Sequence, residues 1–358
     1  MDTDMENLVN PLEKLKITPE LVRLIGQIDE FKGRWEALSN LAPERLTALR
    51  QIATIESIGS STRIEGATLT NDEVEKLLSG LDPTSFRSRD EQEVAGYAEL
   101  MELIFRSWSD ISLNENYILQ LHKILLKHSD KDERHRGKYK TLPNHLEAFD
   151  ENGRSIGVVF ETATPFNTPG LMSNIVSWTS NALDMKEYHP LLVIAVFIVR
   201  FLAIHPFQDG NGRLSRALTT LLLIRSGYTY VPYSSLERII EDNKNGYYLA
   251  LRRAQSTLDG DESQLLDWIT FFFNCLVRQQ EFLERKLMRE RILAPHSPLS
   301  AKIMEIVKEH GKITVRNAVS LTAANRNTVK LHLKQLVNAG HLIQRGRGKG
   351  TWYEKPVW

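Results

Sequence analysis

The chain has 358 residues and a formal net charge of zero, because 45 lysines and arginines balance 45 aspartates and glutamates. This composition, with 42% hydrophobic and 25% charged residues, excludes collagen-like and disordered proteins. A single cysteine, Cys275, excludes an internal disulfide and a cysteine-based zinc site, and it predicts a reducing, cytoplasmic location. The length exceeds what one hydrophobic core usually organises, so we expect two or three units.

Neither of two features that could bring a chain to a membrane is present in a convincing form. The N-terminal segment MDTDMENLVN is acidic, whereas a secretion signal is basic and then apolar, so we predict no such signal. The longest apolar stretch, residues 191–204, is interrupted by Arg200 and is shorter than the roughly 20 residues that cross a bilayer. We therefore predict a buried helix there and no membrane partner.

Most of residues 1–291 show the spacing of amphipathic helices and predict an all-α body. Apolar side chains recur three and four residues apart in residues 21–38, 46–58, 94–108, 117–128, 170–183 and 265–287. Residues 145–162 differ, because short β-type runs flank Asn152-Gly153, a strong hairpin signal. The pattern alone leaves open whether this hairpin is functional or only an excursion between two helices.

The neutral total is the sum of two parts of opposite charge. Residues 292–358 contain seven lysines and four arginines against three glutamates, a charge of +8, so residues 1–291 carry −8. Near this change of sign, Pro295 and Pro298 follow a long charged helix, and two close prolines typically end a helix and form a linker. We therefore place a domain boundary at residues 292–297.

The basic C-terminal part is predicted to contain three short helices and a two-stranded hairpin, and it resembles a winged helix-turn-helix domain. Its predicted recognition helix carries the polar residues Asn325, Arg326, Asn327, Lys330 and Lys334. In this interpretation that helix and the basic tip at residues 345–350 contact DNA, so the predicted interface spans residues 324–351. Winged helices also bind proteins, and the sequence leaves both partners open.

Residues 204–216, with the sequence IHPFQDGNGRLSR, contain several side chains that could take part in catalysis or binding. An apolar helix is predicted to end here, a glycine-rich loop turns the chain, and a new helix begins near Gly212. The backbone N–H groups and positive dipole at such a junction favour an anion, typically phosphate. Arg213 and Arg216 are three residues apart, so they share one helix face and can bind further phosphate oxygens.

Two other side chains of this segment are suited to catalysis. Asp209 precedes the turn and offers the hard oxygen ligand that Mg²⁺ prefers when it bridges phosphates. His205 stands at the end of the first helix and can act as a general base toward a hydroxyl. Singly, each has an ordinary structural explanation, but together they predict a phosphate-handling site.

The same segment resembles the motif of the Fic family, H-x-F-x-[D/E]-G-N-G-R-x-x-R. All eight specified positions match, namely His205, Phe207, Asp209, Gly210, Asn211, Gly212, Arg213 and Arg216. The resemblance covers about residues 50–290. It implies a helical bundle with a small β-hairpin flap, divided into an N-terminal helical region (1–110), a catalytic core (111–291) and the winged helix domain (292–358).

The resemblance implies transfer of AMP from ATP to a Ser, Thr or Tyr hydroxyl of a protein, with release of pyrophosphate. In that reaction His205 deprotonates the hydroxyl, Asp209 holds Mg²⁺ and the amides of residues 210–212 bind phosphate. Phe207 anchors the loop in the core. Residues 145–162 correspond to the family's flap, which binds the target protein as an added strand, and self-modification and a homo-oligomer are further expectations.

Other residues gain expected roles from the same resemblance. Arg213 and Arg216 would bind the β- and γ-phosphates. Tyr247 and Tyr248 resemble a tyrosine pair that lines the nucleotide pocket in relatives, with two packed helix tyrosines as the alternative. Gln255 stands where some relatives have an asparagine near adenine.

A second motif concerns regulation. Ser61 to Gly66, STRIEG, resembles the family's inhibitory pattern [S/T]-x-x-x-E-[G/N] in the class that carries the inhibitory helix before the core. Glu65 would then pair with Arg216 in the place of the γ-phosphate, with Ser61 as the first motif position. This implies a self-inhibited adenylyltransferase.

Two alternatives differ in mechanism. The chain could be a DNA-binding regulator whose Fic-like body senses nucleotide. It could instead remove AMP from a modified protein, in which case Glu65 would orient water and support activity.

Overall fold

The computed structural model describes residues 10, 12, 13, 15–38, 43–80, 86, 88–149, 154–254, 264–293, 298–338, 341–346 and 348–355. The chain divides into two compact units, Met1–Gln280 and Glu281–Trp358. In the parts of the larger unit that the structure describes, the regular elements are helices apart from one hairpin, which confirms the prediction of a mostly helical body. Of the boundary predicted at residues 292–297, residues 292 and 293 end α11, and residues 294–297 lie outside the described residues.

Two consecutive helices form the centre of the larger unit. Helix α7 (Pro190–Ile204) is buried from Leu191 to Ile204, and α8 (Asn211–Arg225) is buried from Asn211 to Ile224. A helix that is apolar on all sides is stable only when other elements cover it. Within the described part of the chain, no helix combines the length and apolar character needed to cross a bilayer.

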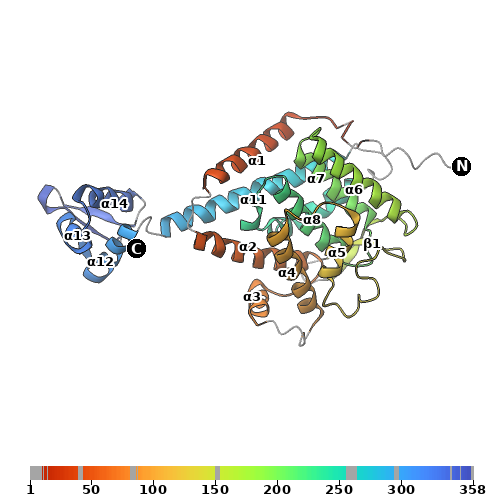
Figure 1. The fold of residues 1–358 in the computed structure, drawn as a ribbon, viewed down its shortest axis with the longest axis horizontal. Helices are drawn as coiled ribbons and strands as arrows, with labels where there is room; N and C mark the ends of the chain where they lie inside the picture. The colour runs from red at the N-terminus through yellow and green to blue at the C-terminus, as the bar shows by residue number, and fades with distance from the viewer. Residues whose placement is uncertain are drawn as a thin grey trace. The chain divides into compact units, whose positions relative to one another are not determined.

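The other helices of this unit surround that centre (Figure 1), and α2, α4, α5 and α7 pack against α8. They are α1 (Pro19–Leu38), α2 (Pro43–Ile64), α3 (Asn71–Ser79), α4 (Arg89–Ser107), α5 (Glu115–Leu125), α6 (Thr168–Met185), η1 (Val231–Tyr233), α9 (Leu236–Glu241), α10 (Lys244–Arg253) and α11 (Leu265–Leu293). Four of the six periodic stretches fall within one of them, whereas 94–108 extends one residue past α4 and 117–128 extends three residues past α5. The nine-residue α3 and six-residue α9 are too short to show a clear period.

The C-terminal half of α2 packs close to its neighbours because its buried side chains are small. Ser57, Ser60, Ser61 and Thr62 are all buried there. Small residues let helices approach closely, and the buried hydroxyl of Thr62 donates to the Ile58 carbonyl at 3.0 Å. This packing brings the end of α2 to the start of α8.

The predicted hairpin is present. Strand β1 (His145–Phe149) pairs antiparallel with β2 (Ser155–Glu161), and the register shifts twice, between Leu146 and Glu147 and between Ala148 and Phe149. Such shifts bend a ribbon and increase its twist. The Asn-Gly tip of the hairpin lies outside the described residues.

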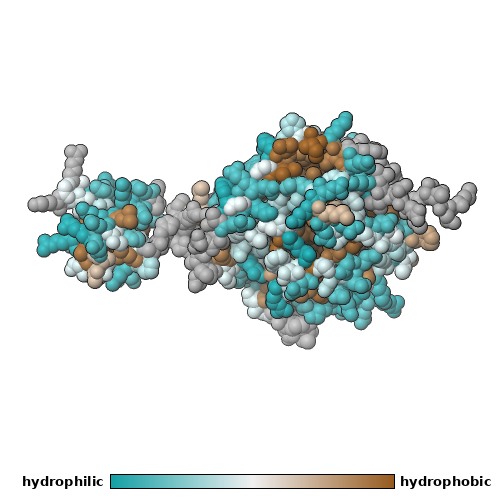
Figure 2. Space-filling view, turned by 45° about the horizontal axis from the view of Figure 1, so that its top comes forward, coloured by the Kyte–Doolittle hydropathy of each residue, from teal (hydrophilic) through white to brown (hydrophobic). Residues whose placement is uncertain are grey.

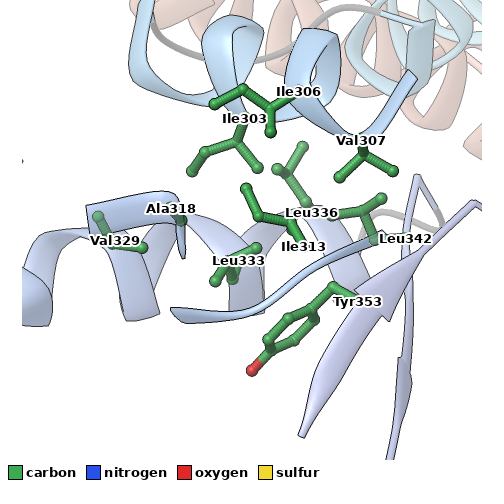
Figure 3. Close-up of a cluster of buried hydrophobic side chains, with 10 residues drawn as sticks. All are labelled: Ile303, Ile306, Val307, Ile313, Ala318, Val329, Leu333, Leu336, Leu342 and Tyr353. Atoms are coloured by element: carbon green, nitrogen blue, oxygen red, sulfur yellow. The ribbon is translucent and has the colours of Figure 1, made fainter. Parts of the chain in front are cut away.

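The smaller unit has its own hydrophobic core (Figure 3). Its elements are α12 (Pro298–His310), β3 (Lys312–Ile313), α13 (Val315–Thr322), α14 (Arg326–Asn338), β4 (Ile343–Arg345), η3 (Gly348–Gly350) and β5 (Trp352–Glu354). Side chains from all three helices and the sheet point toward one another, among them Ile303, Ala318, Leu333 and Tyr353. The expected two strands are joined by β3, so the sheet has three strands in the order β3-β5-β4.

Candidate active site

The loop between α7 and α8 is fixed by backbone conformation and by one asparagine. His205 ends α7 with φ 51° and ψ 60°, and Gly210 precedes α8 with φ 80°, a conformation that glycine adopts at little cost. The Asn211 side chain accepts from the Phe207 N–H at 2.8 Å and donates to the Phe207 carbonyl at 2.7 Å. The Asn211 side chain is therefore bound to the loop. The backbone N–H of Asn211 belongs to the first residue of α8.

A buried histidine on α5 holds the other side of this loop. The His122 ring stacks on Phe207, with centroids 3.8 Å apart, and is 0% exposed. Its Nδ1 accepts from the Gly137 N–H at 2.8 Å, and its Nε2 therefore donates to the Asp209 carbonyl at 2.9 Å. Burial lowers the pKa of His122 to about 4, so the ring is neutral and this tautomer is kept. The sequence analysis did not identify His122, because its partners are remote along the chain.

The base of the hairpin binds the loop through a lysine that the sequence analysis also missed. The Lys140 ammonium donates to Asn144 Oδ1, Thr162 Oγ1 and the Ile204 carbonyl at 2.8 to 2.9 Å. Asn144 in turn donates to the Phe207 carbonyl at 2.7 Å. These bonds connect both ends of residues 145–162 to the segment that carries His205.

His205 has the properties of a general base at neutral pH. Burial lowers its pKa to about 4, and the nearby Lys140 charge acts in the same direction. The ring is therefore neutral at pH 7. Its Nδ1 lies 3.2 Å from the Leu202 carbonyl, so Nδ1 carries the proton and Nε2 has the lone pair that can accept another.

Asp209 and Arg213 belong to a closed ring of four charged side chains. Arg213 lies 3.0 Å from both Glu93 Oε2 and Asp209 Oδ1, and Arg89 lies 2.7 Å from Glu93 Oε1 and 3.0 Å from Asp209 Oδ2. Burial opposes ionisation of Asp209, but Arg213, Arg89 and Lys131 outweigh it and lower its pKa. Arg213 is 2% exposed, so it is a buried member of this ring.

The residues at this position suit Mg²⁺ only in combination with phosphate. Among the described residues, no three or more His, Cys, Asp and Glu side chains gather into a metal cluster. Asp209 is a single ionised carboxylate, and Mg²⁺ is usually held by one or two carboxylates together with phosphate oxygens and water. The Arg89 side chain on Oδ2 is 52% exposed, so it can move away from Asp209.

The segment from Ser61 to Gly66 lies directly against the start of α8. Arg216 donates from Nε to Ser61 Oγ at 2.8 Å and from Nη2 to the Ser61 carbonyl at 2.9 Å and to Glu65 Oε1 at 2.8 Å. A Cβ at Gly212 would collide with Glu65 Oε1, so only glycine admits the carboxylate there. An anion of this chain thus occupies the helix N-terminus where the sequence predicts phosphate.

Both tyrosines of α10 are buried beside this contact. The Tyr248 hydroxyl donates to the Ile64 carbonyl at 3.1 Å. Tyr247 is 4% exposed, and burial raises its pKa to about 12, with the Arg216 charge opposing. The pair therefore borders the end of α2 and Arg216, whereas Gln255 lies outside the described residues. Every other residue that the sequence predicts for the site falls in this one region.

Comparisons with known proteins agree with this geometry. Residues 112–223 match the Fic/DOC family. The chain is 27% identical over 270 residues to a protein named "Protein adenylyltransferase Fic" from Aedes aegypti and 28% identical over 264 residues to one from Drosophila yakuba, covering 73% and 72% of this chain. It spans 48% of each relative, about half its length.

Two solved structures share the fold. A Fic family protein from Desulfovibrio desulfuricans G20 superposes with a TM-score of 0.63 at 23% identity, covering 96% of this chain and 97% of that one. A Fic domain containing signaling protein from Bacteroides thetaiotaomicron gives a TM-score of 0.58 at 25% identity, covering 72% of this chain and 95% of that one.

Proposed function

We propose that this chain, which contains a Fic/DOC domain over residues 112–223, transfers AMP from ATP to a hydroxyl group of a protein. The observation that carries the proposal is the placement of a neutral histidine, an ionised aspartate and a helix N-terminus around one loop. The names of the relatives from Aedes aegypti and Drosophila yakuba support the same reaction. Cys275 is the single cysteine of the sequence and is buried, and on this cysteine usage we propose a cytoplasmic location.

In the proposed reaction His205 Nε2 accepts the proton of the acceptor hydroxyl. The oxygen then forms a bond to the α-phosphorus of ATP, the bond to the β-phosphate oxygen breaks, and pyrophosphate leaves. The amides at residues 210–212 and the α8 dipole stabilise the phosphate charge. Asp209 would hold Mg²⁺, which supplies further positive charge to the phosphates.

We propose further that Glu65 inhibits this reaction. Its carboxylate occupies the start of α8 and the Arg216 guanidinium, both of which a triphosphate requires. Arg216 is 4% exposed, and although burial opposes its charge, Glu65 together with Tyr247 and Tyr97 raises its pKa. Two anions cannot share this position, so ATP binds weakly or with its α-phosphate misplaced while Glu65 is present.

Incubation with Mg²⁺ and ATP labelled at the α-phosphate tests both proposals. Label should enter protein, increase with Glu65→Gly and disappear when His205→Ala is added to that variant. No transfer to the protein itself or to a lysate from any variant would overturn the proposed activity. Glu65→Gln keeps the size of the side chain and serves as the matched control for loss of charge alone.

Removal of AMP is the alternative reaction at the same site. An AMP-modified protein incubated with the wild type and with Glu65→Gly distinguishes the two. If Glu65 orients water, the variant loses hydrolysis, whereas the inhibitory role predicts that transfer increases.

We place the target protein at the flap, residues 145–162. The two ends of this hairpin are bonded to the segment of His205 through Lys140 and Asn144, so a strand added to the hairpin would bring its hydroxyl toward the base. The chain itself is a second acceptor. Mass spectrometry of the Glu65→Gly variant after exposure to ATP identifies both the added group and the modified peptide.

We propose a second function for the C-terminal unit, DNA binding by a winged helix. Its α14 carries Arg326, Lys330 and Lys334, all exposed, and hydrophilic residues cover most of the face of this unit seen in Figure 2. Fluorescence anisotropy with labelled duplex DNA should show affinity that falls steeply with salt and weakens in Arg326→Ala. No DNA affinity at low salt would overturn this function without affecting AMP transfer.

A further inference from the structure

Arg63, in the last turn of α2, donates five hydrogen bonds from its guanidinium. Its guanidinium forms a two-point pair with Glu241 of α9, with Nε to Oε1 at 2.7 Å and Nη2 to Oε2 at 3.0 Å. The other donors reach the Leu69 carbonyl at 2.9 Å, Asn71 Oδ1 at 3.1 Å and Ser60 Oγ at 3.2 Å. Arg63 thereby connects the end of α2, the following loop, the start of α3 and the end of α9.

The place of Glu241 on its own helix makes this arginine a favourable partner. Glu241 is the last residue of α9, where the helix dipole disfavours a negative charge. Planar pairing with a guanidinium is the strongest hydrogen-bonded ion pair available to a carboxylate. Because both side chains are about a quarter exposed, at 23% and 26%, the pair is held firmly but can open.

A glycine one turn earlier makes room for the arginine. A Cβ at Gly59 would lie 2.7 Å from Arg63 Nη1 and 2.6 Å from Asn71 Oδ1. Glycine is unfavourable inside a helix, by about 1 kcal/mol relative to alanine. Its presence here lets the Arg63 side chain fold back across α2 toward α9.

The backbone carbonyls of Arg63 and of the next residue are held by α10. Lys244 donates to the Arg63 carbonyl at 3.2 Å, and Tyr248 donates to the Ile64 carbonyl at 3.1 Å. Glu65 follows directly, in a turn closed by the Glu65 N–H to Thr62 carbonyl bond at 3.0 Å and by Gly66 at φ 99°. The position of the Glu65 carboxylate therefore depends on how the preceding two residues are fixed.

We propose that Arg63 and Glu241 are positioning residues that hold Glu65 against Arg216, and that opening this pair activates the enzyme. The proposal rests on the proposed function, in which Glu65 is inhibitory. With the pair broken, the turn at residues 65–66 loses its attachment to α9. The Glu65 carboxylate then leaves Arg216 more often, and the start of α8 becomes available to the triphosphate.

The test compares AMP transfer and ATP affinity, measured by calorimetry, in the full-length chain. Arg63→Ala, Glu241→Gln and Gly59→Ala should each raise transfer and ATP affinity, by about 5- to 100-fold as is usual for coupled sites. Arg63→Lys retains a positive charge for Glu241 but loses the two-point pairing of the guanidinium. Its AMP transfer and ATP affinity should therefore lie between those of the wild type and Arg63→Ala. Glu241→Gln keeps the shape of the side chain, so it decides the outcome if Arg63→Ala fails to fold.

A second ion pair between the same two helices provides the matched control. Arg238 of α9 lies 2.9 Å from Glu56 of α2, two turns before Glu65. Arg238→Ala loosens α2 against α9 without touching the inhibitory turn, so it should leave transfer unchanged. Activation by Arg238→Ala equal to that of Arg63→Ala would overturn the proposal.

The double variant separates this proposal from the proposed function. In the Glu65→Gly background, Arg63→Ala should add nothing, because Arg63 acts through Glu65; a further increase would overturn the inference. If Glu65→Gly is active but Arg63→Ala and Glu241→Gln do not raise AMP transfer, the inference is overturned and the proposed function stands. If no variant transfers AMP, the proposed function fails, and the ATP affinities alone decide whether the pair positions Glu65.

Discussion

Replacing His122 with glutamine should remove a defined part of the protein's sensitivity to acid. The ring is 0% exposed, and burial, assisted by the Arg213 charge, lowers its pKa from 6.5 to about 4. The unfolded chain therefore binds this proton before the folded chain does. The stabilisation is complete above about pH 6.5 and is lost as the pH falls toward 4.

The size of the effect follows from the shift. Each pKa unit corresponds to about 1.4 kcal/mol, so the whole range is worth roughly 3 kcal/mol and the step from pH 7 to pH 5 about 2 kcal/mol. Glutamine can donate to the Asp209 carbonyl and accept from the Gly137 N–H, but it does not titrate. The variant should thus retain the two contacts and lose the pH dependence.

Urea unfolding followed by circular dichroism at pH 7 and pH 5 provides the measurement. Other titrating groups contribute equally to both proteins, so the difference between wild type and His122→Gln isolates this residue. The wild type should lose about 2 kcal/mol more than the variant over this step. Equal losses in the two proteins would refute the argument that the buried neutral ring is held by Asp209 and Gly137.

Three further predictions concern the loop and the charged ring. Because the pKa of His205 is about 4, the rate of AMP transfer in the Glu65→Gly variant should stay constant from pH 8 down to about pH 5; an acid limb near 6.5 would contradict the neutral-base assignment. Lys140→Met should lower the free energy of unfolding in urea by about 2 kcal/mol because it removes three hydrogen bonds from a charged donor, whereas an unchanged midpoint would show that these bonds contribute little. Glu93→Gln should destabilise the protein by about 3 kcal/mol, because Arg213 is 2% exposed and loses a charged partner; thermal unfolding at the wild-type temperature would argue against the closed ring.

The sequence predicted those parts of the site that lie close together along the chain. The loop expected to bind an anion, the expected base and the basic helix occupy residues 205–216, and the glycine pattern indicates a helix start there. The long helices were predicted because a buried face repeats over several turns. The hairpin was predicted because its turn residues have a distinctive preference.

The parts that the sequence did not predict depend on contacts between distant segments. Lys140 and His122 hold the loop from 64 and 87 residues away, and no local pattern marks either. Arg213 was expected to face phosphate together with Arg216, but the structure pairs it with Glu93, 120 residues earlier in the sequence, and with Asp209. Similarly, the third strand of the C-terminal sheet is a two-residue segment, too short to show alternation.

The segment from Ser61 to Gly66 illustrates both what the sequence predicted and what it did not. Glu65 and Ser61 were predicted from a short pattern, and the structure places both on Arg216. The contacts that fix their position, from Arg63 to Glu241 across 178 residues, required the fold. A motif identifies which side chains act, whereas the tertiary structure shows which ones hold them in place.

The most direct test of the account is the covalent mass of the chain and of lysate proteins after incubation of Glu65→Gly with ATP and Mg²⁺. The account predicts addition of one adenylyl group to a Ser, Thr or Tyr hydroxyl, little addition by the wild type, and none when His205→Ala is combined with Glu65→Gly. Absence of the adduct in the Glu65→Gly variant, or its persistence without His205, would contradict it.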